Sequence, residues 1–108
     1  MSNNEADLTI DVDERDAGMT VTVVGEIDSS NCDRLQALLS DRASSGHPGT
    51  VHVELSGVSF IDSSGLRALL VGQQAIMAAS GAMHVTNASD NVRRLFEITG
   101  LTERLGTA

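Results

Sequence analysis

The sequence predicts an α/β fold, a single domain with a mixed sheet of four to five strands and three to four helices. Its length of 108 residues fits one domain rather than two. Several short segments are rich in β-branched residues, as strands usually are. Between the later ones, apolar residues recur every three or four positions, which is typical of helices that cross between parallel strands. The predicted order of elements is β-β-α-β-α-β-α.

The start of the chain predicts a β-hairpin. Residues 1–6 are polar and are expected to be disordered, so the folded domain is placed over residues 7–106. Apolar and polar residues alternate over 8–13, which indicates a half-buried strand whose charged outer face suits a sheet edge. A turn at 16–18 leads into the β-branched segment 19–24, the second strand of the hairpin.

A helix and a third strand are predicted next. Apolar residues lie on one helical face at spacings of three and four: Cys32, Leu35, Leu38, Leu39 and Ala43. Three residues that favour N-caps precede this helix: Ser29, Ser30 and Asn31. Residues 44–49 contain Gly and Pro and stop it. The third strand is carried by Val51, Val53 and Leu55, and three more apolar residues follow it: Val58, Phe60 and Ile61.

The C-terminal half predicts two more helices around a short strand. Residues 62–65 open a helix whose apolar stripe runs from Leu66 to Met77, and a second side of small residues suits close packing on the sheet: Ala68, Val71, Gly72 and Ala75. Gly81 is expected to end this helix. A strand at 83–86 precedes a helix with one apolar face: Val92, Leu95, Phe96 and Thr99. Gly100 closes that helix, and a short tail over 101–105 is expected to dock on the domain.

The composition excludes several classes of function. Fifteen acidic residues against seven basic ones give a net charge of −8, which argues against nucleic acid as a partner. All basic residues are arginines, so there is no P-loop lysine and no Schiff-base lysine. The single cysteine, Cys32, excludes an intramolecular disulfide and is expected to be a small core residue. No segment resembles a signal peptide or a membrane helix, so we expect a cytoplasmic protein.

Residues 58–66 are the most informative segment. A buried strand end runs into Asp62-Ser63-Ser64-Gly65 and then into a helix with an apolar period. Asp62 is placed to cap that helix, and Ser63 and Ser64 fall in its first turn, where free backbone N–H groups can accommodate a phosphate. Read locally, the same residues could also do no more than cap a helix.

Three segments carry a family resemblance that covers residues 7–106. Ser59 to Leu66 resembles the signature of STAS domains and, more narrowly, of the bacterial anti-sigma factor antagonists. Gly25-Glu26-Ile27-Asp28 resembles the element that follows the second strand of this family. Residues 92–101 resemble its third helix with the Gly-Leu ending.

The resemblance implies a protein without catalysis of its own that binds an anti-sigma factor and so releases a sigma factor. In this family the partner is a GHKL-type serine kinase that phosphorylates the serine after the signature Asp, and a serine phosphatase resets it. That position is Ser63 here, with Ser64 as the fallback. By the same resemblance, the partner surface comprises Glu26, Asp28, Ser29, Asp62, Ser63, Ser64, Gly65 and Arg67. Neither a cofactor, a metal, nucleic acid nor a membrane is expected, and the chain is expected to be a monomer or a weak dimer.

Other functions are weaker alternatives. A STAS domain can also serve as a scaffold or as a ligand- or nucleotide-sensing module in another signalling complex. An acyl-carrier-like protein would be all helix, which the predicted strands oppose. A hydrolase nucleophile elbow would need glycine where Ile61 stands. The remaining polar candidates are expected to be ordinary surface or strand residues, and the two methionines to be core: His47, His52, His84, Arg93 and Arg94, with Met77 and Met83.

Overall fold

A computed structural model describes residues 2–4, 8–15 and 17–106. The strands are β1 (Ser2–Asn4), β2 (Leu8–Arg15), β3 (Gly18–Ile27), β4 (Thr50–Ile61) and β5 (Ala82–Thr86). The helices are α1 (Cys32–Ala43), α2 (Ser63–Ala78), α3 (Asp90–Thr99) and α4 (Thr102–Leu105). The predicted α/β class and the order of the elements are therefore confirmed.

The five strands form one mixed sheet in the order β1-β2-β3-β4-β5. The predicted hairpin is present, since β2 pairs antiparallel with β3 from Leu8 opposite Gly25 to Arg15 opposite Gly18. The pairs β3–β4 and β4–β5 are parallel, and α1 and α2 make the crossovers between them. A mixed sheet of this kind excludes the all-helical, acyl-carrier-like alternative.

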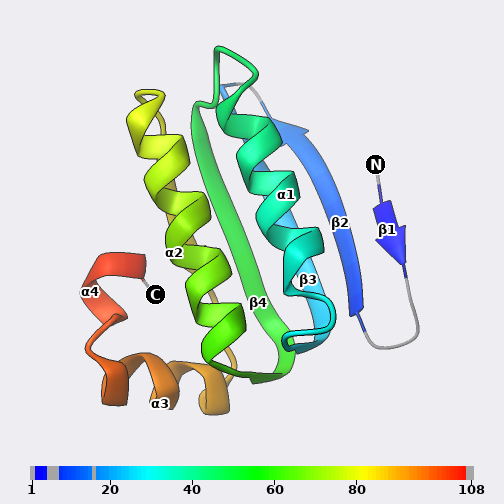
Figure 1. Cartoon of the computed structure of the whole chain (residues 1–108), viewed down its shortest axis with the longest axis vertical. Coiled ribbons are helices and arrows are strands. Elements are labelled where there is room, and N and C mark those ends of the chain that lie inside the picture. Colours follow the sequence, from blue (N-terminus) through cyan, green and yellow to red (C-terminus); the bar gives the residue numbers. More distant parts are fainter. Residues whose placement is uncertain (1, 5–7, 16, 107–108) are drawn as a thin grey trace.

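The core lies between the sheet and the two long helices, which run side by side across one face (Figure 1). Alternate strand residues point into it, and the helices supply the other wall; its fully buried members include Ile10, Val21, Val23, Val51, Val53, Leu35, Leu39, Leu69, Ile76 and Phe96. Met83 and Cys32 are buried as predicted. Gly72 meets α1 rather than the sheet: a Cβ there would lie 2.5 Å from Leu39 Cδ1, so the small residue lets the two helices approach.

Details of the prediction fail where a tertiary contact overrides the local pattern. Met77 is 59% exposed rather than core, and the buried residues of α2 end one position earlier, at Ile76. The left-handed residue after α2 is Ser80, with φ of 71°, and not Gly81. Glycine is nevertheless needed at 81, since a Cβ there would lie 2.8 Å from Gly49 O.

The N-terminus also differs from the expectation of a disordered segment over residues 1–6. Ser2–Asn4 form β1, paired antiparallel with residues 9–11 of β2. β1 thereby covers part of a strand side that would otherwise present unpaired backbone N–H and C=O groups, over residues 9–11 of β2. Met1, Glu5 and Ala6 lie outside the described residues, as does residue 7 at the predicted domain boundary.

Candidate functional site

The predicted serine segment opens α2. Asp62 is the N-cap in extended conformation, and its Oδ1 accepts a hydrogen bond of 3.0 Å from Gly65 N. This is the cap that the sequence predicts. Ser63, the first residue of α2, is exposed, and Ser64 beside it is half-buried. The Ser63 hydroxyl is therefore accessible, and the cap made by Asp62 fixes the backbone of the helix start on which it lies.

Gly65 holds that helix start against the ends of two strands. A Cβ on residue 65 would lie 2.6 Å from Ile61 Cγ1 on β4 and 2.8 Å from Ile27 Cγ2 on β3. Both isoleucines are buried, so neither can swing out into solvent. The signature glycine is thus a packing residue: it sets how closely the first turn of α2 approaches the sheet, and with it where Ser63 lies.

The loop between β3 and α1 is fixed by a buried asparagine. Asn31 is 3% exposed; its Oδ1 accepts from Asp28 N at 2.9 Å, and its Nδ2 donates to Glu26 O at 2.8 Å. Asn31, one of the three predicted cap candidates, is the N-cap residue of α1, but its side chain makes no cap hydrogen bond to that helix. The sequence analysis did not predict that the Asn31 side chain holds this loop in place through Glu26 O and Asp28 N.

The same loop presents a carboxylate that stays ionised. Hydrogen bonds from the Ser30 hydroxyl (2.5 Å) and from Ser30 N (2.9 Å) to Asp28 Oδ1 lower the pKa of that carboxyl below its ordinary value. Glu26 and Ser29 on either side of it are exposed. The segment is thus held by hydrogen bonds and carries two carboxylates, Glu26 and Asp28, which are called the acidic ridge below.

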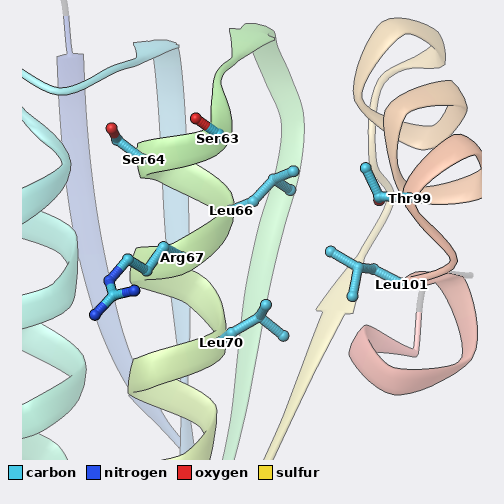
Figure 2. A pocket seen from close by; sticks show the side chains of 7 residues that line it. All are labelled: Ser63, Ser64, Leu66, Arg67, Leu70, Thr99 and Leu101. Carbon is cyan, nitrogen blue, oxygen red and sulfur yellow. The ribbon is translucent and has the colours of Figure 1, made fainter.

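Parallel pairing brings this loop and the start of α2 together. Ile27 and Ile61 are register partners at the ends of β3 and β4, and Asp62 N donates to Ile27 O at 3.1 Å. Seven of the predicted surface residues therefore meet at one edge of the sheet: Glu26, Asp28, Ser29, Asp62, Ser63, Ser64 and Gly65. Arg67 lies one turn further along α2, exposed, with its guanidinium pointing away from both serines (Figure 2).

A depression of about 520 Å³ adjoins the serines. Figure 2 shows Leu66 and Leu70 on the side of α2 that faces Thr99 and Leu101, from the end of α3 and the segment after it. The sequence did not connect residues 99–101 with the serines, because only the packing of the chain end beside α2 brings them near. The site is thus an exposed hydroxyl flanked by an acidic ridge on one side and a partly apolar hollow on the other.

The remaining candidates lie in the core or on the surface: Cys32 is buried, and His47, His52, His84, Arg93 and Arg94 are exposed. Burial raises the pKa of the Cys32 thiol, with Asp33 and Asp62 acting in the same direction, so the reactive thiolate is disfavoured. His52 and His84 are exposed neighbours on β4 and β5 with ring centroids 6.3 Å apart. Arg93 pairs with Asp90 on its own helix.

The described ranges hold neither a group of metal-ligating side chains nor a helix that could span a membrane. No three His, Cys, Asp or Glu residues among them are grouped so that they could hold a metal ion. None of the helices in these ranges is long and apolar enough to cross a membrane.

Comparison with known proteins assigns the whole domain. A family model described as "Mlab, STAS domain" matches residues 10–107. The chain is 31% identical to an anti-sigma-B factor antagonist of Staphylococcus aureus, over 89% of this chain and 88% of the relative. A crystal structure of an anti-sigma factor antagonist from Mycobacterium paratuberculosis is 26% identical with a TM-score of 0.81, covering 93% of this chain and 84% of that one. The Bacillus cell fate determinant SpoIIAA in its phosphorylated form is 25% identical with a TM-score of 0.70, covering 92% and 90%.

Proposed function

Since this chain belongs to the STAS domain family, we propose that it is an anti-sigma factor antagonist whose partner is an anti-sigma factor of the GHKL serine kinase type. Binding of the antagonist releases the sigma factor, and phosphorylation of Ser63 ends the binding. A serine phosphatase then restores the binding form. The protein performs no catalysis in this cycle and is the substrate of its two partners.

The observation that carries the proposal is the exposed Ser63 hydroxyl at the capped start of α2, within a surface of fixed geometry. A kinase must reach the hydroxyl of its substrate, and Ser63 is the more exposed of the two candidate serines. The similarity to relatives named as anti-sigma factor antagonists supports the class of partner. That one similar structure is of a phosphorylated form supports this mode of control.

Phosphorylation is expected to act on the interface and to leave the fold intact. A phosphoserine carries about −1.5 to −2 charges at pH 7. At the first residue of α2 the free N–H groups and the positive end of the helix dipole favour that charge. The phosphate would stand beside the carboxylates of Asp28 and Asp62, so the docking surface becomes more negative and bulkier. Dissociation of the partner follows from repulsion and steric overlap.

The test uses the GHKL-type serine kinases of the organism that encodes this chain, each purified and incubated with the protein and ATP. Mass spectrometry should locate one phosphoryl group on residue 63. Ser63→Ala should abolish labelling and keep kinase binding, whereas the matched control Ser64→Ala should be labelled normally. Labelling confined to Ser64 would move the assignment by one residue, and absence of both binding and labelling with every kinase would refute the proposed function.

A further inference from the structure

Large apolar side chains that are exposed deserve an explanation when they lie beside a candidate interface. Four are found among the described residues: Val24, Phe60, Met77 and Ile98. Phe60 is 49% exposed and comes two residues before Asp62, whereas Phe96, the second phenylalanine of the chain, is fully buried. Phe60 is thus an exposed aromatic residue near the end of β4, the strand that leads to Ser63 at the start of α2.

Two irregularities in β4 turn Phe60 outward. Val51, Val53 and Leu55 point inward in regular alternation. The register with β3 then shifts twice, from Thr22–Glu54 to Val24–Gly57 and from Gly25–Val58 to Glu26–Phe60, with β4 supplying one extra residue each time. After the first shift the next side chain that points into the core is Val58 and not residue 57. If side chains then simply alternated, residue 60 would be the next one buried. The second shift buries Ile61 instead and leaves Phe60 outside, as bulges that re-aim a side chain do.

Phe60 lies beside one of the carboxylates of the acidic ridge. Its register partner on β3 is Glu26, which is exposed, and the next residues along the two strands lead to Asp28 and Asp62. Val24, two residues before Glu26 on β3, is 47% exposed and packs against Gly57 of β4. A Cβ on residue 57 would lie 2.9 Å from Val24 Cγ2. An exposed aromatic side chain therefore lies beside the exposed carboxylate of Glu26, at the end of the strand that leads into Asp62 and Ser63.

We propose that Phe60 anchors the docking of the anti-sigma factor, by inserting into an apolar pocket of that partner whose rim is basic. The inference rests on the proposed function, and it names Phe60 as the residue that contributes most to the free energy of binding the anti-sigma factor. Aromatic residues surrounded by polar ones dominate many interfaces, because the anchor is desolvated while the rim excludes water. The basic rim of the partner pocket would face Glu26 and Asp28.

This anchor also accounts for the sensitivity of binding to phosphate. Ser63 follows Phe60 by three residues, across the turn from β4 into α2. A strongly hydrated dianion within an interface that also buries Phe60 must either lose its water or keep the partner away. Phosphorylation would therefore expel the partner from the Phe60 contact without any change in the fold of this chain.

The test compares Phe60→Ala with Ile98→Ala, a matched control that removes an exposed apolar side chain from α3. Isothermal titration calorimetry measures the Kd of each variant for the GHKL-type serine kinase that binds the wild-type protein. Phe60→Ala should weaken binding by about 30-fold or more, as for an interface anchor. Ile98→Ala should change the Kd by less than about threefold, as for a surface residue outside the interface. Phe60→Leu, which keeps an apolar side chain, should lie in between and covers the case in which the alanine variant folds poorly.

The outcomes separate the two claims. Wild-type affinity in folded Phe60→Ala or Phe60→Leu protein would overturn the Phe60 anchor and leave the proposed function standing. Failure of the wild-type protein to bind any of the kinases would overturn both. If size-exclusion chromatography showed that Phe60→Ala converts a dimer of this chain into a monomer while kinase binding is unchanged, Phe60 would serve self-association and the anchor would be refuted.

Discussion

Replacing Gly65 by alanine adds a single methyl group at the point where α2 meets both parallel strands. The new Cβ would stand 2.6 Å from Ile61 Cγ1, 2.8 Å from Ile27 Cγ2 and 3.1 Å from Ile61 Cδ1. Three contacts shorter than ordinary van der Waals distance against two buried side chains cannot all be relieved by one rotation. We therefore expect the first turn of α2 to move away from the sheet.

The size of the effect follows from two opposing contributions. Overpacking of a filled site costs about 1–3 kcal/mol. Alanine is a better helix former than glycine by up to about 1 kcal/mol in a helix interior, and by less in the first turn. The net expectation is a loss of about 1–2 kcal/mol in the free energy of unfolding, which lowers Tm by roughly 5–15 °C for a domain of this size.

Thermal and urea unfolding followed by circular dichroism measure this change directly. Ser64→Ala in the same turn is the control, and it should stay within about 0.5 kcal/mol of wild type because it removes a half-buried hydroxyl and adds nothing. Since Gly65 also places Ser63, phosphorylation of Gly65→Ala by the kinase should slow even where the protein is fully folded. A Gly65→Ala variant as stable as wild type would refute the packing argument.

Asp62→Ala should lower the free energy of unfolding by about 1 kcal/mol through loss of the N-cap, whereas Asp62→Asn, which can still accept from Gly65 N, should lose much less; equal losses in urea denaturation would contradict the capping role. The Cys32 thiol, buried and with a raised pKa, should react with N-ethylmaleimide far more slowly at pH 8 in the native protein than in urea, as followed by intact mass; equal rates would show that the thiol is accessible.

Much of the candidate site could be predicted from local sequence. Asp62 caps α2 because an aspartate directly before an apolar-periodic segment accepts from the N–H three residues on, a contact within one turn. Ser63 and Ser64 then fall in the first turn by count alone. The family resemblance added Glu26, Asp28 and Ser29, and the parallel pairing of β3 and β4 brings them to the same edge.

The residues that the sequence did not assign depend on contacts between distant segments. Asn31 looked like any helix cap, and its role as the lock of the β3–α1 loop appears only once Glu26 O and Asp28 N are close to its amide. Thr99 and Leu101 join the hollow beside the serines because the chain end packs beside α2. Such contacts leave no periodic signal in the chain.

Apart from β1 and the short α4, the strands and helices and the hydroxyl that opens α2 follow from local sequence, because periodicity, capping and turn chemistry are interactions within a few residues. Which of the apolar residues at the end of β4 are buried depends instead on how that strand pairs with β3. Ile61 and Phe60 are adjacent and both apolar, yet the strand register with β3 packs one inside and leaves the other at the surface. Side chains alternate along a strand, so one extra residue in one strand of a pair reverses their direction, and that residue is set by pairing across the sheet.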